Sequence, residues 1–179
     1  PDGTILASCA GEVILWSIDK GKVESIGALR PHKSPITSLS WSVDGSKFAT
    51  ASADKTIAVQ DTNTGKVSRR FKEHTEIVNT VVFFRQNPNI LVSGDDAGAI
   101  IASDLRQSEC IVRKRTKRPI TCISLIPEDK FSVADVCGNI YIDRLNEKEV
   151  KWECKLQCNS IIFGTAADPT GSYLAANES

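Results

Sequence analysis

The sequence lacks an excess of either charge, a long hydrophobic run and a dense cysteine framework. Lysine and arginine equal aspartate and glutamate at 22 each among 179 residues, so the formal net charge is zero. A general polyanion-binding domain carries a basic excess, which this balance excludes. The longest apolar run, about eight residues around Ile77–Phe84, is far shorter than the ~20 that a membrane-spanning helix needs. We therefore expect a folded domain with no membrane contact.

Six cysteines are spread along the chain instead of being grouped. Zinc sites usually bring four ligands in two tight pairs. Only Cys154 and Cys158 lie close together, far in sequence from His32 and His74. Most of the cysteines sit inside apolar runs, as small hydrophobic residues do. We expect buried thiols, no metal site and no cofactor, and a reducing compartment, the nucleus or the cytoplasm.

Short runs of alternating apolar and polar residues recur along the chain. Residues 36–41, 47–52, 56–61 and 66–71 are rich in Val, Ile, Thr, Ser and aromatic residues, and turn residues such as Asp44-Gly45 separate them. Four segments of about six residues joined by tight turns predict a meander of antiparallel strands. No helical period of useful length interrupts them.

The same unit returns at a regular spacing. His32 and His74 lie 42 positions apart, and each precedes an apolar run. The ends of the expected third strands recur at steps of 40 to 44 positions, at Trp16-Ser17, Gln60-Asp61, Ser103-Asp104 and Asp143-Arg144. One four-stranded sheet cannot bury both of its faces alone. Sheets of this kind must therefore pack against neighbouring copies of themselves.

An upstream histidine, four strands per unit and a closing Trp-Asp-like pair resemble the WD-repeat β-propeller family, over essentially the whole chain. The resemblance implies an all-β fold with about four blades of antiparallel four-stranded sheet. Because family propellers usually close with seven blades, we expect a fragment of a larger propeller. The expected propeller segment spans 1–179, with approximate units 1–29 (partial), 35–71, 77–114, 119–155 and 160–179 (partial).

The resemblance also implies a buried hydrogen-bond network of His, Ser or Thr, Asp and Trp in each blade. In the third unit Ala97 stands at the aligned aspartate position, with Asp96 beside it. The fourth unit keeps none of the four residues, and half-satisfied polar networks are costly, so we expect weaker blades toward the C-terminus. The residues that match the network are Trp16, His32, Thr50, Asp54, His74 and Ser93, whereas Gln60, Ser103 and Asp143 replace the tryptophan.

Within the family, Ser52-Ala-Asp-Lys-Thr-Ile-Ala-Val59, the turn at 62–65 and the His-Thr…Val-Asn stretch at 73–79 resemble the WD-repeat subunits of the spliceosomal U5 particle. This resemblance implies a non-catalytic scaffold for pre-mRNA splicing in the nucleus. Its partners would be other U5 proteins, with RNA contacted indirectly at most and no small-molecule substrate. Another WD-repeat adaptor, such as a substrate receptor of a ubiquitin ligase, or a propeller that binds RNA directly, is the alternative.

Enzymatic activity is not expected from these residues. Nucleophilic catalysis needs a Ser or Cys beside a positioned base. His32 and His74 are the only histidines, and both occupy the family's structural position. No Walker-type phosphate loop is present, since the glycines stand singly at turns.

One basic cluster stands out between the third and fourth units. Residues 113–118 carry five cations in six positions, and we place them in the loop between two units. The cluster is either a solvated loop that opposes edge-to-edge pairing or a contact for RNA phosphates or an acidic partner. No aromatic residue lies within it, so base stacking is unsupported. The candidate contacts are Arg113, Lys114, Arg115, Lys117 and Arg118, with Arg69 and Arg70 in the equivalent loop one unit earlier.

Overall fold

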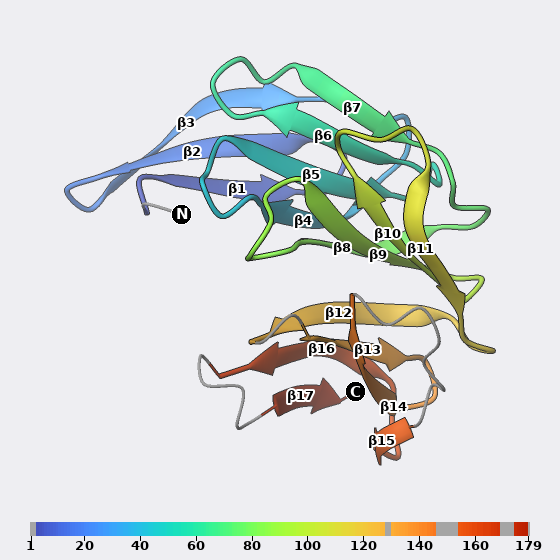
Figure 1. Cartoon of the computed structure of the whole chain (residues 1–179). Helices are drawn as coiled ribbons and strands as arrows, with labels where there is room; N and C mark the ends of the chain where they lie inside the picture. The colour runs from blue at the N-terminus through green and yellow to red at the C-terminus, as the bar shows by residue number, and fades with distance from the viewer. Residues whose placement is uncertain (1–2, 128–129, 146–153, 169–173, 179) are drawn as a thin grey trace.

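A computed structural model describes residues 3–127, 130–145, 154–168 and 174–178. All seventeen elements within these ranges are β-strands (Figure 1). Within the same ranges, no helix occurs that is long and apolar enough to cross a membrane. The prediction of an all-β fold is confirmed.

The strands form five antiparallel sheets, each a meander of strands that are consecutive in the chain. The first sheet contains β1 (Ile5–Cys9), β2 (Val13–Asp19) and β3 (Lys22–Leu29). The second contains β4 (Ile36–Trp41), β5 (Lys47–Ser52), β6 (Ile57–Asp61) and β7 (Val67–Phe71). The third contains β8 (Val78–Phe83), β9 (Ile90–Asp95), β10 (Ala99–Asp104) and β11 (Cys110–Arg115). The fourth contains β12 (Ile120–Ile126), β13 (Lys130–Asp135), β14 (Asn139–Arg144) and β15 (Cys154–Gln157), and the fifth β16 (Ile162–Ala167) and β17 (Leu174–Glu178).

The sheets pack against one another in chain order. The first strand of each later sheet contacts the first strand of the next, so that β4, β8, β12 and β16 form a continuous inner row. Figure 1 shows this succession from the blue strands of the first sheet to the red strands of the fifth. Four-stranded sheets packed face to face in sequence order are the blades that the repeat spacing predicts.

Four hydrophobic cores lie between consecutive sheets and hold them together. Strand β5 shows the cause, because Phe48 packs toward the first sheet and Ala49 toward the third. Successive side chains of a strand point to opposite faces, so a strand covered on both sides is buried along its whole length. Representative core residues are Val13, Leu15 and Phe48; Ile57, Phe71 and Val81; Ile100, Ile123 and Phe131; and Ala134, Ile140 and Ile162.

Hydroxyl side chains satisfy the inner edges of the sheets. Strands β4, β8 and β12 are edge strands and pair with a neighbour on one side only. The N–H and C=O groups on their unpaired side therefore have no partner within the sheet. The Phe83 backbone N–H donates to Ser40 Oγ at 3.0 Å, and the Ile123 N–H donates to Thr80 Oγ1 at 3.2 Å. Each hydroxyl thus comes from the preceding sheet. Further hydroxyl contacts join Thr37 to Val78 and Ser38 to Val81, and the Asn79 side-chain amide donates to the Ile120 carbonyl oxygen.

Most of the basic residues lie in strands and not in loops as the sequence suggested, whereas Lys117 and Arg118 do lie in the loop after β11. Arg113, Lys114 and Arg115 belong to β11, and Arg69 and Arg70 belong to β7. Strand β11 alternates half-buried and exposed residues, so its cations do not all face the same way. The placement in a loop was wrong because a run of charges hides the period-two pattern by which a strand is recognised.

The cysteines are less buried than expected. Of those whose side chains the structure describes, Cys122 alone is buried, and all are free thiols. Burial raises the pKa of the Cys122 and Cys9 thiols, which disfavours the reactive thiolate. Cys154 has its side chain outside the described residues. The remaining thiols are half-buried at Cys9, Cys110 and Cys158 and exposed at Cys137.

Candidate interaction site

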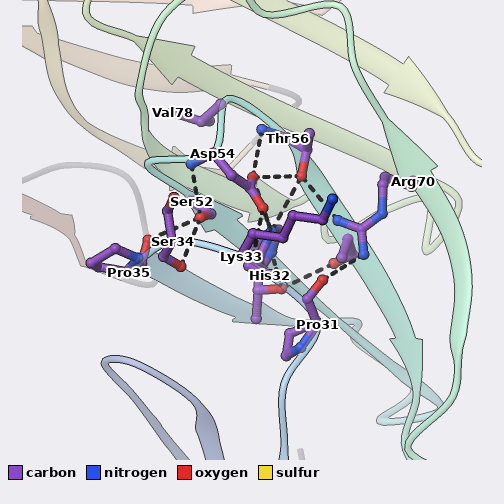
Figure 2. Close-up of polar contacts among 12 residues, drawn as sticks. Pro31, His32, Lys33, Ser34, Pro35, Ser52, Asp54, Thr56, Arg70 and Val78 are labelled. Atoms are coloured by element: carbon purple, nitrogen blue, oxygen red, sulfur yellow. Dashed lines mark hydrogen bonds and ion pairs between the residues drawn. The ribbon is translucent and has the colours of Figure 1, made fainter.

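The loop before β4 and the turn after β5 meet at a network centred on His32. The imidazole is fully buried, with Nδ1 3.0 Å from Asp54 Oδ2 and Nε2 2.9 Å from Thr50 Oγ1. Asp54 also accepts from the Thr56 N–H and hydroxyl at 3.0 and 2.7 Å. Figure 2 shows these side chains converging from the two segments. The structure therefore brings His32, Thr50 and Asp54 together.

Gln60 extends this network at the position where the family has tryptophan. Its side chain is completely buried, and its amide lies 3.1 Å from Thr50 Oγ1. With the amide nitrogen turned to donate to the Phe48 carbonyl oxygen at 2.9 Å, both ends of the side chain are satisfied. A glutamine can thus close the network without an aromatic ring, because it supplies both a donor and an acceptor.

The third sheet has a complete network, with an aspartate that lies before the aligned position at Ala97. His74 Nδ1 lies 2.8 Å from Asp95 Oδ2, and His74 Nε2 lies 2.7 Å from Ser93 Oγ. Ala97 and Asp96 do not take this place, since exposed Asp96 instead accepts from Asn79 Nδ2 at 2.6 Å. Asp95 was not predicted as a network residue. A signal was present, because buried Asp135 ends the equivalent strand of the next sheet 40 positions later.

Ser93, His74 and Asp95 share the order of contacts of a hydrolase triad, but their surroundings differ. The Ser93 hydroxyl is 1% exposed and lies 3.3 Å from the Ile101 carbonyl oxygen. A substrate carbonyl therefore has no access to it. The arrangement holds the loop before β8 to the end of β9, which is a structural task.

Trp16 lies apart from both histidine networks. It is in β2 of the first sheet, where its Nε1–H donates to Ser8 Oγ at 2.9 Å. This bond joins neighbouring strands β1 and β2, as the tryptophan of the family pattern joins the third strand to the second. The network residues thus fall into three separate groups, one for each of the first three sheets.

Acid should weaken the His32 network. Burial lowers the pKa of His32 below its ordinary value, although the Asp54 hydrogen bond opposes this. Burial acts to raise the pKa of Asp54, but hydrogen bonds from Thr56, the Lys33 backbone and His32 outweigh it and the net shift is downward. Both groups hold protons less tightly in the folded state. Stability is therefore complete above the unfolded pKa values and is lost as pH falls, first below about 6.5 and again below about 4.

Urea unfolding at pH 7.5, 5.5 and 3.5 measures this dependence, with the midpoint expected to fall at each step. The variant His32→Asn should lose part of the step between pH 7.5 and 5.5, because it removes one group that titrates there. A midpoint that rises on acidification would contradict this assignment.

Ser103 replaces tryptophan in the third sheet and leaves a polar atom without a partner. Among the described residues its Oγ is the buried side-chain oxygen or nitrogen that makes no hydrogen bond. An unpaired buried hydroxyl costs about 1–3 kcal/mol. We expect Ser103→Ala to stabilise the fold by about 1 kcal/mol, whereas Ser93→Ala, which breaks a paired hydroxyl, should destabilise it. Urea midpoints of the two variants check this, and equal losses would contradict it.

Two arginines of the basic segments support the histidine loops. Arg70 Nη2 donates to the Pro31 carbonyl oxygen at 2.5 Å, and Arg113 Nη2 donates to the Glu73 carbonyl oxygen at 3.2 Å. Each carbonyl belongs to the residue directly before the network histidine. Arg70 and Arg113 therefore fix the two loops in the same way, and their guanidinium groups are partly occupied.

The other cations of the two segments divide between inward and outward positions. The Lys114 side chain is 10% exposed and donates to buried Asp143 at 2.5 Å. The prediction of Lys114 as a surface contact is therefore wrong. Arg69 donates to the Gln107 carbonyl oxygen and Arg115 to that of Ala97. The exposed loop residues of the cluster are Lys117 and Arg118.

Gly98 lets the loop that carries these two residues approach the turn after β9. Its φ is +78°, and a Cβ there would lie 2.6 Å from the Arg118 carbonyl oxygen. The Thr116 N–H donates to the Gly98 carbonyl oxygen at 2.8 Å. Lys117 therefore sits on a loop that the backbone itself holds in place.

A pocket of about 490 Å³ opens beside the His32 network. Its walls are the loop before β4, the turn after β5 and the end of β7. Lys33 and Lys72 line it. Lys72 follows Arg69 and Arg70 in the basic stretch noted in the sequence, whereas Lys33, which adjoins His32, was not predicted as a contact. Among the described residues, no group of three potential metal ligands occurs here or elsewhere.

Known proteins resemble this chain in repeat and in sequence. A family model for the WD domain, G-beta repeat, matches residues 23–61, from β3 to the end of β6. The U5 small nuclear ribonucleoprotein 40 kDa protein of Dictyostelium discoideum is 33% identical over 123 residues, 68% of this chain and 34% of that protein. Pre-mRNA-splicing factor cwf17 of Schizosaccharomyces pombe is 28% identical over 127 residues, 70% of this chain and 37% of that protein.

A WD repeat-containing protein 55 homolog of Drosophila melanogaster is 26% identical over 174 residues, 92% of this chain and 34% of that protein. The chain thus spans about a third of the length of the curated relatives it matches. The repeated four-stranded sheets, the histidine networks and the match to the family model all indicate WD repeats. The chain is a WD40-repeat protein with blades of the β-propeller type.

Proposed function

We propose that this chain is part of a non-catalytic protein-interaction scaffold that acts in pre-mRNA splicing, as a subunit of a U5-type particle in the nucleus. The observation that carries the proposal is the 33% identity to a U5 ribonucleoprotein subunit over 123 residues. A second relative is named as a pre-mRNA-splicing factor. The other proteins of that particle are the expected partners.

The structure suits a scaffold because the loops are held by buried groups. Hydrophobic cores fix each sheet against the next, and the networks of His32 and His74 tie loops to strand ends. A loop held in this way loses little conformational freedom when a partner binds, which favours affinity.

Direct RNA binding through the basic segments is less well supported. Lys114 is engaged with Asp143, and Arg70 and Arg113 donate to backbone carbonyl groups. Fewer of these cations are therefore free to neutralise phosphates than the sequence suggested. The chain is also similar to WD repeat-containing protein 55 homologs, whose name states no role in splicing. Another adaptor role, such as a ubiquitin-ligase substrate receptor, therefore stays the alternative.

Affinity purification of the tagged protein from nuclear extract tests the proposal. We expect U5 proteins among the partners identified by mass spectrometry, after nuclease treatment as well as before it. Recovery of ligase components without splicing factors would overturn the splicing role. Loss of all splicing factors after nuclease treatment would show an association through RNA and overturn the protein-scaffold role.

A further inference from the structure

We propose that the pocket beside His32 binds an acidic side chain from a peptide segment of a protein partner. This inference deepens the scaffold part of the proposed function, because it names the chemistry of one partner contact. It does not depend on which assembly the protein joins. The pocket is distinct from the basic segment at 113–118, which the sequence singled out.

The charges that line the pocket leave a positive excess. Lys33, Arg70 and Lys72 are cationic, whereas Asp54 is the one carboxylate among the lining residues. Arg30 also lines the pocket, but its Nε lies 3.0 Å from Glu12 Oε2, which offsets its charge. The whole chain has no net charge, so this excess is a local feature and attracts anions to this site.

Asp54 adds little repulsion, because the fold already surrounds its carboxylate with donors. It accepts from Thr56, the Lys33 backbone N–H and His32. Its side chain is only 14% exposed. The carboxylate is turned into the protein, and the cations form the outer part of the pocket.

Arg70 is positioned before any ligand arrives. Its Nη1 donates to Thr56 Oγ1 at 3.0 Å and its Nη2 to the Pro31 carbonyl oxygen at 2.5 Å, as Figure 2 shows. These bonds use two of the five N–H donors of a guanidinium group. The remaining donors can take a carboxylate or phosphate in forked geometry, and little side-chain entropy is left to lose.

The pocket suits a peptide side chain better than a nucleotide. Its volume of about 490 Å³ lies at the small end of the range for ligand pockets, enough for one or two side chains. No Phe, Tyr or Trp is among its lining residues and the His32 ring is fully buried, so a base has no exposed ring to stack on. In the next sheet, Glu73 takes the place of Pro31 before the histidine, and its carboxylate opposes an anion there.

Fluorescence anisotropy with labelled peptides tests the proposal on the complete protein. The probes are hexaglutamate, hexaglutamine, a peptide with one phosphoserine among neutral residues, and oligouridine. The test variant is Lys33→Glu/Lys72→Glu, because both side chains are exposed and Arg70 is left to support its loop. The control is Lys22→Glu/Lys66→Glu, which makes the same charge change at exposed positions away from the pocket.

We expect hexaglutamate or the phosphopeptide to bind, hexaglutamine not to bind, and the test variant to weaken binding at least about tenfold, as for lost charge-assisted hydrogen bonds. The control variant should change the affinity less than twofold. Preference between the two acidic probes distinguishes a carboxylate from a phosphate ligand. Equal weakening by both variants, absence of binding to either acidic peptide, or stronger binding of oligouridine that the test variant abolishes would each overturn the proposal. None of these results bears on which proteins co-purify from nuclear extract.

Discussion

Asp95→Ala should destabilise the protein by about 3 kcal/mol, because it removes a buried acceptor from two donors at once. Asp95 is fully buried, and its carboxylate lies 2.8 Å from His74 Nδ1 and accepts the Ala99 N–H at 2.8 Å. Alanine would leave both donors buried without their acceptor. Urea unfolding at neutral pH measures the loss.

Two matched variants separate the cause. Asp95→Asn keeps the shape and an acceptor for the Ala99 N–H, and its amide can donate to His74 Nδ1 while Nε2 donates to Ser93. We expect it to cost about 1 kcal/mol. Asp96→Ala removes an exposed neighbour and should cost less than about 0.5 kcal/mol beyond its bond to Asn79.

The same three variants decide between Asp95 and Asp96 as the partner of His74. If Asp96→Ala proved more damaging than Asp95→Ala, Asp96 would be the partner of His74, contrary to the contact between His74 and Asp95 in the structure. The nuclear magnetic resonance signals of the His74 ring at neutral pH supply an independent readout. Its chemical shifts should change strongly in Asp95→Asn and little in Asp96→Ala.

Much of the fold was predictable because it depends on local pattern. Alternation in residues 36–41 and 47–52 reports a strand, and the spacing of His32 and His74 reports the repeat. Both signals can be recognised in the sequence without knowing which way each side chain points. Packing of one sheet on the next follows, since neither face of a four-stranded sheet can stay exposed.

The choice of aspartate was not predictable from position alone. In the second unit the network aspartate is Asp54, in the turn after β5, whereas in the third it is Asp95, the last residue of β9. A strand end and the turn that follows it can thus both place a carboxylate beside the histidine of the adjoining loop. Counting from the family pattern selected Ala97, and the chain instead uses Asp95 at the end of β9.

The prediction that the basic cluster forms a surface contact as a whole was wrong for a related reason. Five cations in six residues favour solvent, and a count of charges contains no information on which way each side chain points. In β11, Arg113 and Arg115 are exposed, whereas Lys114 between them points into the interface with the fourth sheet. Its partner Asp143 is buried and occupies the position where the family has tryptophan. The ion pair with Lys114 was therefore not predicted.

Asp143→Ala should therefore cost about 3 kcal/mol, because it breaks a largely buried ion pair by removing the carboxylate that accepts from Lys114. The pair joins β11 of the third sheet to β14 of the fourth at 2.5 Å, and the two side chains are 10% and 0% exposed. Asp143 also accepts the Arg144 N–H at 2.7 Å. Urea unfolding measures the loss, with Arg106→Ala as the control for an ion pair whose arginine is 62% exposed and which should matter by less than about 1 kcal/mol.

A double variant shows whether this contact requires two charges or only requires that neither charge is buried alone. Lys114→Met with Asp143→Leu replaces both ions by apolar side chains, and such replacements are often neutral or stabilising. We expect the double variant to be at least about 2 kcal/mol more stable than Asp143→Ala. If it is as unstable as the single variant, the contact requires two charges, and the replacement of tryptophan by Asp143 is an ionic link between blades. If Asp143→Ala costs no more than Arg106→Ala, Lys114 reaches solvent without its partner and belongs among the surface cations after all.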